Sequence, residues 1–191
     1  MYQTYWQRLF SAGAMDFDDL IYNTVRLLDE HEDVREHWQR RFRYVLIDEY
    51  QDTNNLQYQL AALLADGWGN ICVVGDDDQS IYKFRGATIE NILNFEKQYK
   101  NARTIRLEQN YRSTGRILDA ANHVIANNTG RKGKTLWTKA EAGDPLTLYC
   151  ATNENDEARY VATKIMDDFG HGMNFRDHAV LYRMNAQSNQ L

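Results

Sequence analysis

Two acidic residues, Asp48 and Glu49, directly follow the apolar run of residues 44–47. Such a run, stopped by acids, predicts a buried parallel strand, and open α/β sheets bind ligands at the carboxyl ends of these strands. In nucleoside-triphosphate chemistry, an aspartate here can hold Mg²⁺ through water while the glutamate accepts a proton from the attacking water. Considered alone, an Asp-Glu pair more often forms a polar loop or caps the next helix, expected near Asn54.

The elements that must position these acids follow from apolar periodicity. Strands are predicted at residues 44–47, 71–74, 103–107, 146–150 and 179–182, with helices on the apolar positions of 20–28, 56–64, 89–95, 117–125 and 158–169. Asp16 with Asp19, Ser113 or Thr114, and Asn155 are the predicted N-terminal caps. Repeated alternation of strand and helix predicts an α/β protein with parallel sheets.

Composition narrows the class of protein. With 43% hydrophobic and 12% aromatic residues, one proline and 26% charged residues, the chain can build a core and is not of the disordered or collagen-like class. No apolar run reaches the length of a membrane span, so no membrane partner is expected. The isolated cysteines Cys72 and Cys150 and the absence of a signal peptide predict a cytoplasmic protein with reduced thiols. No cysteine or histidine spacing fits a zinc site.

Charge is unevenly distributed along the chain. The net charge is −5, but residues 79–139 contain twelve Lys or Arg against four acids, a local charge of +8, which leaves −13 elsewhere. A basic face on an acidic body fits a polyanion partner such as phosphate or DNA. An ordinary solvated surface with uneven sampling explains the charge pattern equally well.

The acids belong to one of three motifs that follow one another along the chain. They are VLIDEYQDTN at 45–54, VVGDDDQSIYKFRGA at 73–87 and LEQNYRST at 107–114. Together, and in this order, they resemble the motor signatures of UvrD/PcrA/Rep-type superfamily 1 ATP-dependent DNA helicases. The similarity extends to MDFDDLI at 15–21 and VLYRMNAQS at 180–188, so it covers essentially the whole chain.

The resemblance implies a role for each residue of a nucleotide site that uses ATP and Mg²⁺. Asp48 would bind Mg²⁺ through water, Glu49 would activate the hydrolytic water, and Gln79 would contact the terminal phosphate. Tyr111 would pack on the adenine. Arg112 would reach the terminal phosphate, where a guanidinium can counter the charge that develops during transfer.

The resemblance also implies DNA contacts. Tyr82 and Phe84 match the aromatic residues on which unpaired bases stack, an interaction worth ~1–3 kcal/mol per base, and Arg85 lies beside them. Most relatives have tryptophan where this chain has Phe84, so stacking is expected to be weaker. Two aromatic residues at this spacing are more often core residues, but the interleaved cations Lys83 and Arg85 favour nucleic acid.

The implied fold is a pair of incomplete parallel-sheet RecA-like motor lobes. Residues 1–15 would be the tail of a helical insertion, 16–113 the end of the first lobe and 114–191 the start of the second. The implied parent translocates on single-stranded DNA, 3′ to 5′, and unwinds duplex using ATP. Its implied partners are single-stranded and junction DNA, with repair or replication proteins.

One motif resembles a phosphate-binding loop but fails the pattern. Residues 130–135 read GRKGKT, whereas G-x-x-x-x-G-K-[ST] requires glycine where Asn128 stands, and the stretch follows a helix instead of a strand. It is predicted to be a basic turn, more often a solvated surface turn than a contact to the DNA phosphates of the parent. Without a phosphate loop, the 191-residue chain is expected to be inactive by itself.

Two alternatives remain open from the residues. The chain could be a single-stranded nucleic-acid-binding module without ATPase activity. It could also be a metal-dependent phosphohydrolase in which Asp76, Asp77 and Asp78 join Asp48 around an ion.

Overall fold

The computed structural model describes residues 2–190, so Met1 and Leu191, the outer ends of the predicted segments 1–15 and 114–191, lie outside it. The chain forms two compact units, Met1–Gly143 and Asp144–Leu191. No helix within the described range combines the length and the apolar character needed to cross a bilayer.

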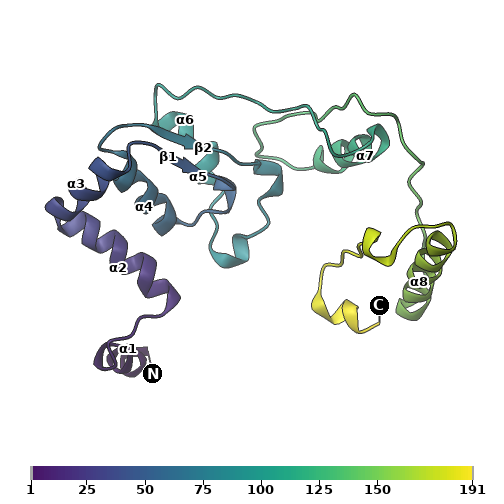
Figure 1. Cartoon of the computed structure of the whole chain (residues 1–191), viewed down its shortest axis with the longest axis horizontal. Helices are drawn as coiled ribbons and strands as arrows, with labels where there is room; N and C mark the ends of the chain where they lie inside the picture. Colours follow the sequence, from purple (N-terminus) through teal and green to yellow (C-terminus); the bar gives the residue numbers. More distant parts are fainter. Residues whose placement is uncertain (1, 191) are drawn as a thin grey trace. The chain divides into compact units, whose positions relative to one another are not determined.

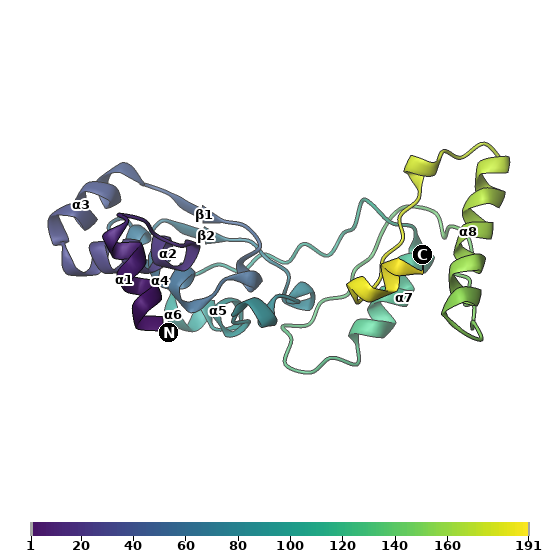
Figure 2. The same ribbon diagram turned by 90° about the horizontal axis from the view of Figure 1, so that it is seen from below.

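The first unit contains most of the regular structure (Figure 1). Its elements are α1 (Tyr2–Ser11), α2 (Phe17–Glu30), α3 (Glu32–Arg41), β1 (Val45–Ile47), α4 (Asn55–Ala65), β2 (Ile71–Val73), α5 (Glu90–Leu93), α6 (Phe95–Gln98) and α7 (Gly115–Ile125). In the second unit, α8 (Glu154–Gly170) is the long helix (Figure 2).

Strands β1 and β2 form a two-stranded parallel sheet. Val45 pairs with Ile71 and Ile47 with Val73. The pairing continues past the strands, since the Val74 N–H donates to the Ile47 carbonyl at 2.8 Å and the Tyr50 N–H donates to the Val74 carbonyl at 2.9 Å. The predicted strand-helix-strand unit, with α4 as the crossover, is confirmed, and the fold is mixed helix and strand with a small parallel sheet.

The helix caps follow the sequence with one exception. The Asp16–Asp19 capping box of α2 is present, and Thr114 occupies the N-cap of α7 without a side-chain hydrogen bond. The prediction for α8 was wrong: Asn153 is the cap, and its side chain accepts the Asp156 N–H at 3.0 Å. Asn155 already lies inside the first turn, where a side chain cannot reach back to the free amides of that turn.

A small helical core lies against the sheet. Helices α2, α3 and α4 contact one another, and the buried residues Val25 and Leu28 of α2 and Ala61 and Ala65 of α4 form its centre. Helix α3 was not predicted. Its signal is charge and not apolar periodicity: acids fill its first turn and Arg40 and Arg41 its last, which complements the helix dipole.

Three predicted strands are absent from the described residues. Residues 103–107, 146–150 and 179–182 have neither helix nor strand, and Leu107, Leu148 and Leu181 are largely exposed. A strand exists only when a neighbour satisfies its backbone hydrogen bonds, and no described segment pairs with these three. The prediction of strands at these three segments was therefore wrong, because apolar alternation does not report whether a partner strand is present.

The basic turn after α7 contacts the acidic loop after β2. Arg131 makes a bidentate pair with Asp78 at 2.6 and 2.5 Å, Lys134 pairs with Asp76, and the Lys132 N–H donates to Asp77 at 2.7 Å. These cations are thus engaged with the protein's own carboxylates.

The pKa of Asp76 reflects this contact. Burial raises it, but hydrogen bonds from Lys134 and Gln79 outweigh burial and hold the pKa of Asp76 below its ordinary value. The ionised carboxylate therefore stabilises the fold at pH values above the pKa of the unfolded chain. This contribution is lost as the pH falls through the lower folded-state pKa.

We therefore predict that Asp76→Asn lowers the melting temperature of the chain near pH 6, because it removes the charge partner of Lys134. The difference from the unsubstituted chain should shrink as the pH falls from about 4, where the aspartate of the unfolded chain becomes protonated, through the lower folded-state pKa of Asp76. Thermal unfolding between pH 7 and pH 3 measures this. Asp119→Asn, at an exposed position of α7, is the control, and its melting temperature should follow that of the unsubstituted chain at every pH. A difference that persisted unchanged in acid would contradict the assignment.

Candidate functional site

The parallel pairing of β1 and β2 brings two polar loops to one edge of the sheet. Residues 48–52 follow β1, and residues 75–79 follow β2. The carboxyl ends of parallel strands lie side by side, and ligands of α/β sheets bind there. The predicted residues Asp48, Glu49 and Gln79 are therefore brought to the same edge.

The backbone of the first loop is unusual at Glu49. Its φ of 50° and ψ of 41° lie in the left-handed region, and no other non-glycine residue of the described range has a positive φ. This conformation costs a residue with a side chain roughly 1–2 kcal/mol. The adjoining Asp48 carboxylate accepts the Glu49 N–H at 2.9 Å, which fixes the turn. Strain of this kind is concentrated at functional sites.

Gln51 connects the two loops. Its side chain is 1% exposed, and its Nε2 donates to Oε2 of Glu49 at 2.8 Å. Its Oε1 accepts the backbone N–H of Asp76 at 2.9 Å. The Asp76 carboxylate in turn accepts from Nε2 of Gln79 at 2.8 Å. A continuous series of hydrogen bonds therefore runs from Glu49 to Gln79.

Gly75 allows the loops to approach this closely. A Cβ at Gly75 would lie 2.5 Å from Oε1 of Gln51 and 3.1 Å from the Tyr50 nitrogen. The first distance is shorter than a Cβ atom tolerates to a non-bonded oxygen, so the amide of Gln51 would have to move. The glycine is required here for space and not for its φ.

A depression borders Asp48 and Glu49. Its other lining residues are Val45, Ile47, Asp52, Thr53, Gln57, Leu60, Ala61 and Leu64. Asp48 is exposed and can offer its carboxylate to a hydrated Mg²⁺, which proteins commonly bind through one or two carboxylates and water. The lining contains no lysine or arginine, so these residues fit the metal and the attacking water but supply no cation for the phosphates.

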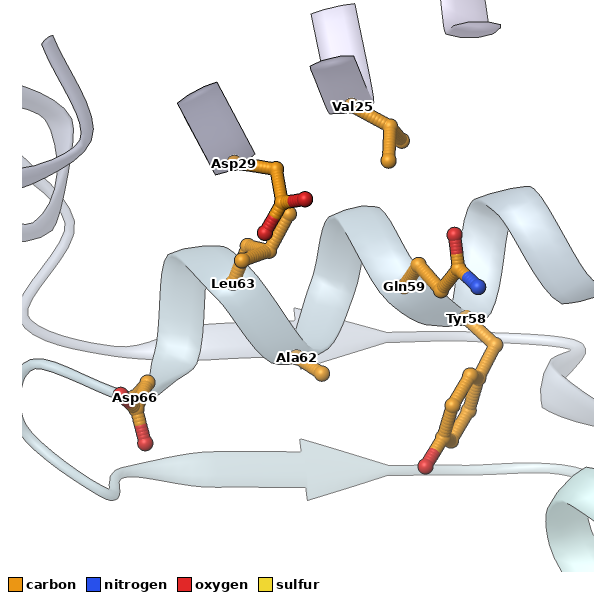
Figure 3. Close-up of a pocket in the computed structure, with 7 residues that line it drawn as sticks. All are labelled: Val25, Asp29, Tyr58, Gln59, Ala62, Leu63 and Asp66. Atoms are coloured by element: carbon orange, nitrogen blue, oxygen red, sulfur yellow. The ribbon is translucent and has the colours of Figure 1, made fainter. Parts of the chain in front are cut away.

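A second depression lies between α2 and α4 and is unrelated to the acidic loops (Figure 3). Figure 3 shows Asp29 of α2 directed toward Leu63 of α4, with Gln59 on one side of Leu63 and Asp66, the C-cap of the helix, on the other. Its lining carries two carboxylates and no cation, which does not suit a phosphate ligand.

The three predicted DNA-binding residues lie together. The Arg85 guanidinium lies 4.9 Å from the ring centre of Tyr82 and 5.5 Å from that of Phe84, and the two ring centres are 5.9 Å apart. Phe84 is 74% exposed, so it is not a core residue, contrary to the more common role of such aromatics. A flat exposed ring beside a cation suits base stacking.

This aromatic group is tied to the loop that carries Glu49. The Thr88 N–H donates to the Thr53 carbonyl at 3.0 Å, and the Asn91 amide donates to the same carbonyl at 3.1 Å. Thr53 in turn donates its hydroxyl to the Tyr50 carbonyl at 2.7 Å. Because of these bonds, a displacement of the segment around Thr88 would move Thr53, and through it the loop at 48–52.

Tyr111 and Arg112 are not brought to the acidic loops. Both are exposed, and neither side chain makes a hydrogen bond or ion pair with another residue of the described range. Their backbone is held by Asn110, whose side chain accepts the Arg112 N–H at 2.9 Å and the Ser113 N–H at 2.8 Å.

The alternative metal site at Asp76, Asp77 and Asp78 is not supported. The three carboxylates do lie close to one another, but Asp48 is not part of the group. Lys134, the Lys132 backbone N–H and Arg131 already engage them.

Sequence reasoning missed Gln51. The residue lies within the acidic motif, but an amide four residues after a strand is normally a solvated loop residue. The available signal was its position between the predicted site residues Asp48 and Glu49 and an apolar helix, which favours partial burial.

Comparison with known proteins identifies the family. Residues 1–100 match the UvrD/REP helicase N-terminal domain, and residues 105–191 match the UvrD-like helicase C-terminal domain. The chain is 52% identical over its 191 residues to the ATP-dependent DNA helicase PcrA of Staphylococcus aureus (strain NCTC 8325 / PS 47). It is 51% identical to the PcrA of Staphylococcus epidermidis (strain ATCC 12228 / FDA PCI 1200). In each case the match covers 100% of this chain and 26% of the relative, so the chain spans about a quarter of those proteins. On these matches and motifs, the chain belongs to the UvrD/REP helicase family.

Proposed function

We propose that the full-length protein to which this chain corresponds is an ATP-driven motor that moves along single-stranded DNA, 3′ to 5′, and separates the duplex. The observation that carries this proposal is that two residues with predicted roles in ATP hydrolysis are connected by hydrogen bonds at one edge of the sheet. Glu49, the candidate base, is linked through Gln51 and Asp76 to Gln79, the candidate phosphate sensor.

In this proposal each residue has one task. Asp48 holds Mg²⁺ through water, and the Glu49 carboxylate accepts the proton of the attacking water. The bound metal would neutralise charge on the terminal phosphates. Gln79 has a neutral amide that can donate to a phosphate oxygen and accept from a neighbour, so it can report the nucleotide state.

Tyr111 and Arg112, directly before the second RecA-like lobe that begins near residue 114, complete the proposed site. Their present exposure supports this, because a stacking ring and an unpaired guanidinium are both available to a ligand. Closure of the two lobes on ATP would bring Arg112 to the terminal phosphate. The partners of this motor are single-stranded and junction DNA, with repair or replication proteins.

We predict that Glu49→Gln in the full-length protein reduces DNA-stimulated ATP hydrolysis by ~100-fold or more, because the amide cannot accept the proton of the attacking water. Nucleotide affinity should change by less than about threefold, since the amide keeps the size of the side chain. Phosphate release and nucleotide titration measure the two effects. Glu141→Gln, at an exposed position, is the control. Turnover retained in the Glu49 variant would refute its role as the base.

We also predict that the 191-residue chain does not hydrolyse ATP by itself. It has no G-x-x-x-x-G-K-[ST] segment, so the backbone N–H groups and lysine that hold the phosphates are missing from it. Phosphate release by the purified chain, with and without oligonucleotide, is the measurement. DNA-stimulated release that Glu49→Gln abolishes would contradict this prediction.

A second function, a single-stranded nucleic-acid-binding module, is favoured by the exposure of Phe84 beside Arg85. We predict that Phe84→Ala weakens binding of the chain to an oligothymidine by roughly 5- to 100-fold at low salt, the loss of one stacked base. Fluorescence anisotropy measures the affinity. Phe10→Ala is a matched control, because Phe10 is 75% exposed but lies on α1. Equal effects of the two substitutions would show that Phe84 has no specific role.

A further inference from the structure

We propose that Gln51 is a positioning residue for hydrolysis: its buried amide holds the Glu49 carboxylate in place and fixes it to the loop that carries Gln79. This inference rests on the proposed function of Glu49. It adds a residue to which the sequence motifs assigned no role.

The first argument is the geometry of the amide. Nε2 of Gln51 has one strong acceptor, Oε2 of Glu49 at 2.8 Å, and a weaker one, a carboxylate oxygen of Asp52 at 3.5 Å. Oε1 of Gln51 has a backbone donor, Asp76 N–H, at 2.9 Å. An amide held by a fixed backbone donor cannot rotate, so it presents its N–H to Glu49 in a single orientation.

The second argument is burial. Gln51 is 1% exposed, whereas Glu49 is exposed. The donor amide is therefore shielded from solvent, while the Glu49 carboxylate that it holds is accessible to water. A hydrogen bond from a buried, immobile donor to a carboxylate loses less side-chain entropy than one between two mobile surface groups. The glutamate thus keeps access to water but loses rotational freedom.

The third argument is the strained backbone. The left-handed conformation of Glu49 persists only where the surroundings hold it. The Asp48 carboxylate holds the Glu49 N–H, and Gln51 adds a contact to the Glu49 side chain. Gly75 leaves the space that this contact needs. The position of the Glu49 carboxylate therefore depends on three local features: the strained turn, the buried amide of Gln51 and the glycine at position 75.

The linkage to Gln79 gives the arrangement a second consequence. Asp76 donates its backbone N–H to Gln51 and accepts the Gln79 amide N–H on its carboxylate. A movement of Gln79 is therefore transmitted to the residue that orients the base. Hydrolysis would be fastest in the state in which both bonds are made.

The test uses the full-length protein with Gln51→Met, which keeps the length of the side chain but removes both hydrogen bonds. We expect kcat for ATP hydrolysis to fall ~10- to 100-fold, the cost of a misplaced catalytic group, with KM and nucleotide affinity within about twofold. Gln59→Met on the exposed face of α4 is the matched control, because no described residue hydrogen-bonds its side chain. A loss confined to melting temperature, with kcat per folded molecule unchanged, would overturn the proposal.

A double variant separates positioning from an independent effect. If Gln51 acts through Glu49, then adding Gln51→Met to Glu49→Gln should slow hydrolysis no further, within about twofold. Multiplicative losses would overturn the proposal while leaving the role of Glu49 intact. Turnover retained in Glu49→Gln alone would instead refute the proposed function, so the two failures are distinguishable.

Two further measurements keep the test decisive if Gln51→Met folds poorly. Gln51→Glu keeps the acceptor for Asp76 N–H but turns the donor toward Glu49 into an acceptor, and it should show the same loss of kcat. In the 191-residue chain, the Asp76 amide should be protected from hydrogen exchange, and Gln51→Met should remove that protection. Normal kcat in Gln51→Glu, or an unprotected Asp76 amide in the unsubstituted chain, would count against the inference.

Discussion

The parallel pairing of β1 with β2 is the constraint on which the candidate site depends. Because the strands run in the same direction, their carboxyl ends meet, and the loops at 48–52 and 75–79 become neighbours although Asp76 is 27 positions after Glu49. Two backbone bonds beyond the strands, at Val74 and Tyr50, extend this alignment into the loops themselves. An antiparallel pairing of the same strands would place the two loops at opposite edges.

The site is assembled from polar contacts supported by a small apolar core. Tyr50, 1% exposed, fixes one end of the acidic loop, and burial raises its pKa to about 12, so its phenol stays neutral at physiological pH. Gln51 is equally buried, yet its amide is fully used by Glu49 and Asp76. A buried amide whose nitrogen and oxygen are both hydrogen-bonded can orient its partner, here the Glu49 carboxylate, without the cost of an unpaired polar group.

Much apolar surface remains uncovered. Ile105, Leu107 and Leu148 are 68%, 77% and 89% exposed. They lie in segments that carry strand-like patterns but have no neighbouring strand among the described residues. The chain spans about a quarter of the length of the relatives it matches.

The sequence by itself determined the local structure and the family. Apolar runs located β1 and β2, helical periodicity and capping residues located α2, α4 and α7, and the ordered motifs identified a UvrD/REP helicase. These features depend on neighbouring residues, so they can be inferred without coordinates. The predicted lobe boundaries and the roles of Asp48, Glu49, Gln79, Tyr111 and Arg112 remain predictions.

Tertiary structure alone decided which distant residues meet. It joined Glu49 to Gln79 through Gln51, paired the basic turn at 130–134 with Asp76–Asp78, and left the strand-like segment 103–107 unpaired. Periodicity and motif spacing describe one stretch of chain at a time. Whether a strand finds a neighbour, or an amide a buried acceptor, depends on groups far away in sequence, and that information exists only once the chain has folded.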